Sequence, residues 1–153
     1  MKIAIVSDTH NNFINFKKAI NWANENGVQM ILHCGDIQTQ EIIDDARKIF
    51  KGEINFVKGN GDYDLNFPEA IEIEADSKKI GFSHFPEIAK KMAKSGKLDI
   101  VFYGHTHKPW EEVIDNCRLA NPGELAGQLF KPTFAVYDTE ANLLELKILD
   151  NLK

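Results

Sequence analysis

Residues 2–10 read KIAIVSDTH, a short apolar run that ends in polar residues, among them an aspartate and a histidine. The β-branched side chains between Lys2 and Ser7 predict a buried strand. An amphipathic helix is predicted next, because apolar residues recur at three- and four-residue spacing: Phe13, Phe16, Ala19, Ile20 and Ala23. Asn12 is suited to cap this helix, and Gly27 to end it. This part of the chain therefore predicts a strand followed by a helix.

The same alternation continues along the chain. Residues 30–32 and 54–57 predict further buried strands. A helix is predicted between them over residues 42–50, and Gly52 is the residue expected to stop it. Beyond Pro68 one helix, over about residues 86–95, interrupts a series of predicted strands: 71–75, 79–83, 99–103, 110–114, 118–120, 134–137 and 144–148. A βαβ half joined to a more antiparallel half predicts an α/β (α+β) fold, in which two sheets pack face to face with helices outside. We expect residues 1–153 to form one domain.

The composition is that of a soluble globular protein. Hydrophobic residues make up 43% of the 153 residues and charged residues 27%, which argues against intrinsic disorder. The net charge of -5 gives no electrostatic reason to expect binding to nucleic acid or to an anionic membrane. Apolar runs are too short to cross a bilayer, a signal-peptide pattern is missing, and Cys34 and Cys117 do not make a disulfide framework. We therefore expect a cytoplasmic protein.

Polar residues follow five of the predicted strands at the point where each strand ends. These residues are Asp8-Thr9-His10, Gly35-Asp36, Gly59-Asn60-Gly61-Asp62, His84 and Gly104-His105-Thr106-His107. Ligands collect at the carboxyl ends of strands in α/β sheets, and glycines let the backbone turn sharply there. Each motif taken singly is more typical of a turn or of a structural histidine. Their occurrence together at one edge of the fold indicates a shared functional site.

Seven of these side chains carry metal-ligating atoms: Asp8, His10, Asp36, Asn60, His84, His105 and His107. Seven donors exceed the four ligands of a structural zinc site and fit two metal ions that share one carboxylate. Imidazole and carboxylate ligands without thiolate suit manganese, iron, zinc, nickel or cobalt better than calcium. Two aspartates with two divalent cations leave such a cluster positively charged, which suits the binding of a phosphate group and in-line displacement at phosphorus.

The same residues, in this order, resemble the pattern of the calcineurin-like metallophosphoesterases: D-x-H, G-D, G-N-H-[D/E], H and G-H-x-H. The short chain and the Asn121-Pro122-Gly123 turn are similar to the compact YfcE-type phosphodiesterases of that superfamily. The resemblance implies a four-layer α-β-β-α sandwich of two mixed sheets. It also implies hydrolysis of a small phosphodiester by a hydroxide that bridges two divalent metal ions. Manganese is the expected metal, and nickel, cobalt, iron and zinc are the alternatives.

The resemblance also implies a role for each ligand position. One metal would be held by Asp8, His10, Asp36 and His107. Asp36 would bridge to the second metal, which is completed by Asn60, His84 and His105. Three of these residues, Asp36, Asn60 and His105, are expected to act in catalysis through the metal-bound hydroxide and the substrate phosphate.

The chain departs from the family pattern at two positions. Gly61 stands where many relatives have a histidine that assists the leaving group, and loss of a general acid typically costs about 10²–10⁴-fold in rate. Phe85 follows His84 in a segment where relatives often carry His-Gly-His; its ring either narrows the pocket, stacks on a substrate ring or packs in the core. Substrates with poor alkoxide leaving groups should therefore react slowly unless another group donates the proton.

Several residues beside the ligand motifs are candidates for substrate contacts or for support of the site. Asn11, Asn12 and Lys108 are candidates for contact with a substrate phosphate only because they flank the ligand motifs. Tyr63 and Trp110 either wall a nucleotide pocket or pack locally. Asp62 either orients the Asn60 loop or is an exposed turn residue. His33 is expected to be a structural histidine and Cys34 a small buried side chain.

Two other functions stay open from the sequence. The same fold also serves as the retromer subunit, a scaffold whose catalytic capacity is in question, and the histidine missing at Gly61 leaves this alternative open. A phosphomonoesterase is disfavoured by the same missing acid and by a chain with little room for a cap domain. We expect a small phosphodiester as the substrate, no membrane association and no stable nucleic-acid binding, with homo-oligomerisation left open.

Overall fold

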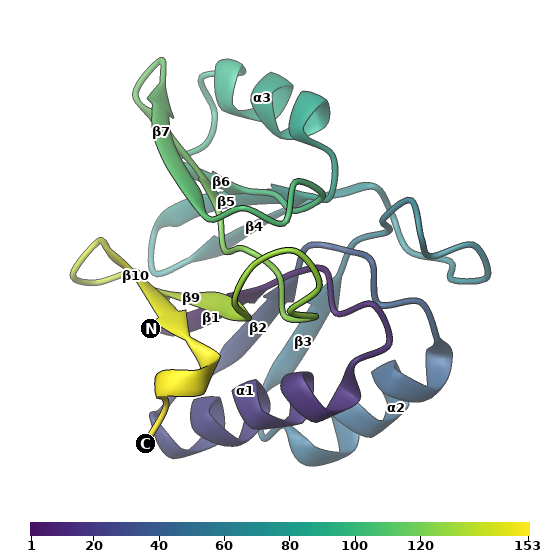
Figure 1. Cartoon of the computed structure of the whole chain (residues 1–153). Helices are drawn as coiled ribbons and strands as arrows, with labels where there is room; N and C mark the ends of the chain where they lie inside the picture. Colours follow the sequence, from purple (N-terminus) through teal and green to yellow (C-terminus); the bar gives the residue numbers. More distant parts are fainter.

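The computed structural model describes residues 1–153, which form two mixed five-stranded sheets and three α-helices (Figure 1). The first sheet has the order β10-β9-β1-β2-β3 and contains β1 (Lys2–Val6), β2 (Met30–His33), β3 (Glu53–Phe56), β9 (Thr133–Asp138) and β10 (Leu143–Ile148). The second has the order β4-β5-β6-β8-β7 and contains β4 (Ala70–Ala75), β5 (Lys78–Ser83), β6 (Ile100–Phe102), β7 (Trp110–Ile114) and β8 (Cys117–Asn121). The helices are α1 (Phe13–Glu25), α2 (Gln40–Ile49) and α3 (Pro86–Lys94), and a 3-10 turn, η1 (Leu149–Asn151), follows β10.

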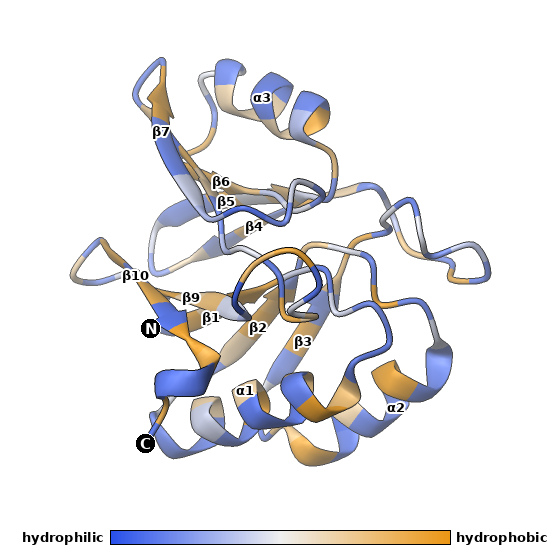
Figure 2. Cartoon of the chain, viewed as in Figure 1, coloured by the Kyte–Doolittle hydropathy of each residue, from blue (hydrophilic) through white to orange (hydrophobic).

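The two sheets pack face to face, and the helices cover their outer faces (Figure 1). Leu32 and Phe82 belong to a buried cluster between the sheets, whereas Ile43 of α2 packs on the outer face of the first sheet. A third cluster, which includes Ala89, joins α3 to the second sheet. Figure 2 shows the same division, with largely apolar inner strands and helices that are polar on one side. The expected α-β-β-α order of layers is confirmed.

The burial of β1 explains why its sequence is a continuous apolar run. Ile3 and Ile5 point into the space between the sheets, whereas Ala4 and Val6 point toward the helices. All four are at most 1% exposed. A strand with both faces covered has no polar face, so it cannot show the alternation of a half-exposed strand. Each fully buried large side chain of this kind contributes roughly 1.5–3 kcal/mol to folding.

Helix α1 begins and ends as predicted, and α2 ends one residue before its predicted last residue. The Asn12 side chain accepts a hydrogen bond from the N–H of Asn15 at 3.1 Å, and Gly27 has a positive φ after the helix. Helix α2 ends at Ile49, one residue before the predicted last helical residue, because Phe50 takes an extended conformation that buries its ring. A Cβ at Gly52 would collide with a backbone carbonyl near β2, so packing explains this glycine better than helix termination.

The connection from β8 to β9, residues 122–132, passes from the second sheet to the first beside the carboxyl end of β1. Its Leu125 N–H donates to the Ser7 carbonyl, and its Ala126 N–H to the Asp8 carbonyl, both at 3.0 Å. The two sheets are therefore tied together at the edge where β1 ends. None of the helices has the length and apolar character required to cross a membrane.

Candidate metal centre

The seven predicted ligand residues lie in loops that follow five strands. Asp8 and His10 follow β1, Asp36 follows β2, Asn60 follows β3, His84 follows β5, and His105 and His107 follow β6. Strands β1, β2 and β3 run parallel, as do β5 and β6, so their carboxyl ends share one direction within each sheet. The structure brings all seven side chains together, in two groups of polar atoms.

The first group consists of Asp8, His10 and His107. The two histidine Nε2 atoms are 3.1 Å apart. Oδ1 of Asp8 lies 3.2 Å from Nε2 of His107 and 3.5 Å from Nε2 of His10. One carboxylate oxygen and two imidazole nitrogens thus converge on one small volume.

The second group consists of Asn60, His84 and His105. Oδ1 of Asn60 lies 2.8 Å from Nε2 of His84 and 3.0 Å from Nδ1 of His105. The two ring nitrogens are 3.2 Å apart. Here one amide oxygen and two imidazole nitrogens converge.

Asp36 lies between the two groups. Its Oδ2 atom is 3.6 Å from Nε2 of His10 in the first group and 3.6 Å from Nε2 of His84 in the second. Its Oδ1 atom accepts a hydrogen bond from the Gly61 N–H at 2.7 Å, which fixes the orientation of the carboxylate. A single oxygen atom of Asp36 therefore faces both groups.

The donor atoms fit divalent metal ions. Asp8 is fully buried, and its Oδ1 atom has no hydrogen-bond partner. The carbonyl oxygen of Cys34 is 2.8 Å from Nδ1 of His84; because a carbonyl only accepts, the proton lies on Nδ1 and the lone pair of Nε2 faces the other donors. The mixture of imidazole nitrogens and oxygens, without thiolate, is typical of sites for first-row transition metals.

In the first group, the carboxylate and the imidazoles shift one another's pKa values. Burial alone would raise the pKa of Asp8, but the imidazoles of His10 and His107 outweigh burial and lower this pKa well below its ordinary value. The nearby carboxylate of Asp8 in turn raises the pKa of His107 to about 9 and also raises the pKa of His10. A metal ion that binds these imidazoles would therefore displace protons from them.

Five of the seven ligand residues have left-handed backbone conformations. The φ angles lie between +44° and +71° for the group Asp8, His10, Asp36, His105 and His107. A non-glycine residue in this region costs of order 1–3 kcal/mol, and such residues cluster at functional sites. The concentration of this strain at one edge of the sheets supports a function for the cluster beyond stability.

Two glycines allow the loops to approach the carboxylates. A Cβ at Gly59 would overlap the carboxylate of Asp36, and a Cβ at Gly104 would overlap the hydroxyl of Ser7 and crowd the carboxylate of Asp8. The glycines of the Gly59-Asn60 and Gly104-His105 motifs are therefore required by close approach, because neither has a positive φ.

Asp62 supports the loops from below the ligand residues. It is fully buried, which excludes the alternative of an exposed turn residue. Oδ2 accepts hydrogen bonds from the N–H groups of Asp36 and Gly59, and Oδ1 from those of Ile37 and Gln38, all at 2.7–2.8 Å. One carboxylate thus connects the loop after β2 with the loop after β3.

Three polar residues that sequence reasoning did not single out contact the ligand side chains. The Ser7 hydroxyl donates to Oδ2 of Asp8 at 2.6 Å, and the Gln38 side-chain amide lies 3.1 Å from Nδ1 of His10. The buried carboxylate of Glu124 lies 2.9 Å from Nδ1 of His107. Glu124 directly follows a turn at the end of a strand, as the ligand residues do, and that position was the available signal.

The two expected structural residues behave as predicted. The buried His33 lies 2.7 Å from the hydroxyl of Thr9 and accepts a hydrogen bond from the Gly35 N–H. Burial lowers the pKa of His33 to about 4, so the ring is neutral near pH 7. Burial also raises the pKa of the Cys34 thiol well above its ordinary value, so this residue is a small apolar side chain.

Asn11 and Asn12 both use their side chains within the protein. Oδ1 of Asn11 accepts from the Thr39 hydroxyl, and Asn12 caps α1 while donating to the carbonyl of Ala126. Phe85 packs edge-on against His84, with ring centroids 5.1 Å apart, and lies 6.1 Å from the ring of His105. The half-buried Phe85 ring therefore walls the second group.

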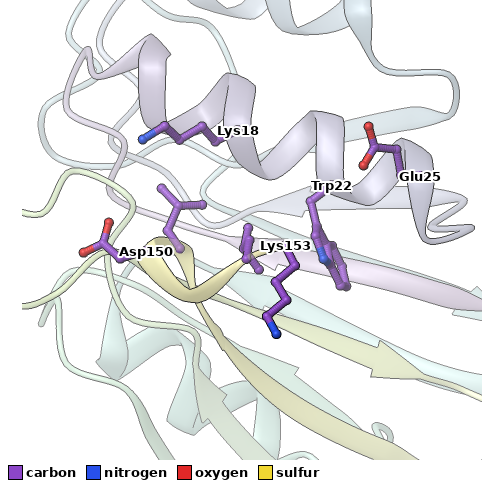
Figure 3. Close-up of a pocket in the computed structure, with 7 residues that line it drawn as sticks. Lys18, Trp22, Glu25, Asp150 and Lys153 are labelled. Atoms are coloured by element: carbon purple, nitrogen blue, oxygen red, sulfur yellow. The ribbon is translucent and has the colours of Figure 1, made fainter.

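Trp110 and Lys108 both line a pocket of 460 Å³ beside the loop that carries His105 and His107. Tyr63 does not line this pocket, and its side chain is 84% exposed. The Lys108 ammonium lies 5.6 Å from the centroid of the Trp110 ring. A separate hollow of 370 Å³ lies between α1 and the C-terminal residues; Lys18, Trp22, Glu25, Asp150 and Lys153 are among its lining residues (Figure 3). It contains none of the seven ligand residues.

Sequence and structure comparisons agree on the relatives of this chain. Residues 1–142 match the calcineurin-like phosphoesterase superfamily domain. The chain is 34% identical to phosphodiesterase MJ0936 of Methanocaldococcus jannaschii, with 92% of this chain and 94% of that protein covered. It matches the solved structure of an archaeal phosphodiesterase with a TM-score of 0.87 and 31% identity, covering 97% of this chain and 99% of the other.

More distant structures share the fold alone. Vps29 of Entamoeba histolytica, solved in complex with zinc, matches with a TM-score of 0.74 at 22% identity, covering 95% of this chain and 90% of the other. The two mixed sheets and three helices are thus the metallophosphoesterase fold. By the extent of the domain match and by its identity to the archaeal relative, the chain belongs to the calcineurin-like phosphoesterase superfamily.

Proposed function

We propose that the protein is a phosphodiesterase that hydrolyses a small phosphodiester with two divalent metal ions. The observation that carries this proposal is the position of Asp36, whose Oδ2 atom lies 3.6 Å from a histidine nitrogen of each donor group. Two groups of three donors joined by one carboxylate fit a pair of metal ions better than a single ion. The phosphodiesterase name of the 34% identical relative supports the same reaction class.

Each donor group would hold one metal ion. Asp8, His10 and His107 would hold the first ion, and Asn60, His84 and His105 the second, with Asp36 shared. When bound, such a pair of ions supplies Lewis acidity that activates water and neutralises the phosphate during in-line displacement. We propose manganese as the metal. Nickel, cobalt, iron and zinc are alternatives, because all five metals accept imidazole and carboxylate ligands.

The protein's own residues would hold the metals and the phosphate in a fixed geometry. In this proposal three residues act in catalysis through the metals that they would hold: Asp36, Asn60 and His105. Asp62 keeps the Asp36 and Asn60 loops together through four backbone hydrogen bonds. The fixed loops supply orientation, which is a large part of enzymatic rate enhancement.

Gly61 restricts which phosphodiesters would react well. Its position offers no side chain to protonate a leaving group, and a missing general acid typically costs about 10²–10⁴-fold. We therefore propose substrates whose leaving groups need little protonation, such as aryl esters, as the best artificial substrates. Diesters with poor alkoxide leaving groups would be hydrolysed slowly.

A scaffold function is the second candidate, because Vps29 structures share the fold. The missing histidine at Gly61 favours this candidate, whereas the complete set of seven donors favours the enzyme. The intact donor set is the stronger argument, since a scaffold has no need of five strained ligand residues.

Hydrolysis of bis(p-nitrophenyl) phosphate and p-nitrophenyl phosphate by metal-stripped protein, with and without Mn²⁺, tests the proposal. We expect metal-dependent cleavage of the diester in excess of the monoester, and loss of that activity in Asp36→Asn. Protein that binds two metals but cleaves neither ester with manganese, nickel, cobalt, zinc or iron would support the scaffold instead.

A further inference from the structure

Glu124 is a buried carboxylate to which the proposed hydrolysis assigns no role. It follows the Asn121-Pro122-Gly123 turn, in the connection between β8 of the second sheet and β9 of the first. The side chain is fully buried, and its one ion-pair partner is the imidazole of His107. A buried carboxylate is costly unless hydrogen bonds replace its lost hydration. Its partners therefore indicate its role.

Four donors surround this carboxylate. Oε1 accepts hydrogen bonds from the N–H groups of Leu129 and Phe130, both at 2.6 Å, and Oε2 accepts one from the N–H of Gln128 at 3.0 Å. Nδ1 of His107 lies 2.9 Å from the same Oε2 atom. The three backbone donors are consecutive, so they fix the carboxylate in the orientation in which it meets His107.

This contact determines which ring nitrogen of His107 is free. An ionised carboxylate accepts and does not donate, so the proton of the shared hydrogen bond lies on Nδ1 of His107. In the neutral ring, the lone pair is then on Nε2, which lies 3.2 Å from Oδ1 of Asp8 and 3.1 Å from Nε2 of His10. Metal-ligating histidines commonly donate their other N–H to a carboxylate in this way.

We propose that Glu124 is a positioning residue that sets the tautomer and the orientation of His107 for metal binding. This inference rests on the proposed function, because it takes His107 to be a metal ligand. The segment that Glu124 organises also supports Asp8, since the Ala126 N–H donates to the Asp8 carbonyl at 3.0 Å. The segment that contains Glu124 thus contacts both the backbone of Asp8 and the imidazole of His107.

Glu124→Gln tests the inference with little change in side-chain size. If the glutamine oxygen still accepts from Leu129 and Phe130, its NH₂ group faces Nδ1 of His107 and favours a proton on Nε2 instead. We expect the metal-free variant to bind Mn²⁺ about 10–100-fold more weakly than the wild type at the site that includes His107, measured by isothermal titration calorimetry.

Thr133→Val is the matched control. The Thr133 hydroxyl donates to the Pro122 carbonyl at 2.7 Å, so this variant removes one buried hydrogen bond from the same connection without touching His107. We expect it to lose stability in urea but to bind Mn²⁺ like the wild type. Unchanged Mn²⁺ affinity in Glu124→Gln, or an equal loss in Thr133→Val, would overturn the inference. Wild-type protein that binds no metal would overturn the proposed function as well, so the two failures are distinguishable.

A measurement on the wild type covers the case in which Glu124→Gln does not fold. In zinc-loaded, ¹⁵N-labelled protein, long-range ¹H–¹⁵N correlation spectra should show the His107 ring with its proton on Nδ1. A spectrum with Nδ1 bound to zinc, or with a proton on Nε2, would overturn the inference regardless of the variants.

Discussion

Oδ1 of Asp8, which follows a strand of the first sheet, lies 3.2 Å from Nε2 of His107, which follows a strand of the second. This oxygen is buried and has no hydrogen-bond partner within the protein. An unsatisfied buried acceptor costs roughly 1–3 kcal/mol, and more when it is charged. A cation held between the two atoms would remove this cost, so metal binding should stabilise the fold as well as supply chemistry.

Metal addition is therefore expected to raise the unfolding temperature. A ligand that binds only the folded protein stabilises it by about 2.7 kcal/mol at one hundred times its dissociation constant. We expect the melting temperature of metal-free protein to rise continuously with Mn²⁺ concentration, as measured by scanning calorimetry. Ca²⁺ at the same concentration is the control, because it prefers six to eight oxygen ligands. Equal shifts with both ions would argue against a site built from imidazoles.

Asp36→Asn should weaken both metal positions at once. The Gly61 N–H will keep the asparagine carbonyl where Oδ1 of Asp36 now lies, so the NH₂ group will face His10 and His84. An NH₂ group donates and cannot ligate a metal. We expect bound manganese to fall at both positions and diesterase turnover to fall by at least about 100-fold.

Asp44→Asn is the matched control for Asp36→Asn. Asp44 lies on the exposed side of α2, where it accepts a hydrogen bond from the Gln40 side chain. Metal content, measured by mass spectrometry, and turnover should both stay at wild-type values. Loss of only one of two metals in Asp36→Asn would show that Asp36 is not shared.

Gly61→His should accelerate the hydrolysis of diesters with poor leaving groups. A Cβ at Gly61 would lie 3.3 Å from Oδ1 of Asp36 and 3.5 Å from the side-chain nitrogen of Gln38, so a side chain fits with a small adjustment. We expect a gain of about tenfold or more on alkyl diesters and little gain on aryl diesters, because a general acid matters most for poor leaving groups. Gly61→Ala, which adds only the Cβ, should show no such preference; an equal effect of both variants would contradict a proton-transfer role.

Asp62→Asn should destabilise the protein and loosen the metal site. Each Asp62 oxygen accepts two backbone N–H groups, so the NH₂ group of an asparagine would face two donors in either orientation. We expect the free energy of unfolding to fall by roughly 2–4 kcal/mol, measured by urea denaturation. Manganese affinity should fall with it, because Asp36 loses a backbone contact. Wild-type stability in this variant would show that the four hydrogen bonds are dispensable.

His33 should make the metal-free protein less stable in mild acid. Burial lowers its pKa to about 4, whereas the unfolded chain has an ordinary histidine pKa near 6.5. Above pH 6.5 His33 is neutral in both the folded and the unfolded protein, so it does not change the stability with pH in that range. Between pH 6.5 and 4 the unfolded state is protonated and the folded state is not, so stability falls by roughly 3 kcal/mol over this interval.

Urea unfolding from pH 7.5 to 4 measures this effect by comparing the wild type with His33→Asn. The asparagine removes the titrating group but keeps an acceptor for the Gly35 N–H. We expect the wild-type curve to fall more steeply with decreasing pH than the variant curve. Parallel curves would exclude His33 as a source of acid sensitivity.

The local sequence determined most of the secondary structure and the seven candidate ligand positions. Buried strands such as β1 follow from continuous β-branched runs, because both faces of the strand are covered. The candidate ligand residues stand out because each lies in the segment after such a strand, in a pattern that also occurs in a known family. Information of this kind lies within a few residues along the chain.

The tertiary structure decided what depends on contacts between distant segments. By sequence Asp62 fits either an exposed turn or a buried support, and its four backbone partners decide between them; no ligand motif marks Glu124, which contacts His107. Gly52 was interpreted as a helix stop, whereas a collision with a distant carbonyl explains it. Burial of a polar side chain depends on which segments pack over it, and hydropathy along the sequence does not contain that information. For this reason the candidate ligand positions could be predicted from the sequence, and the residues that hold them in place could not.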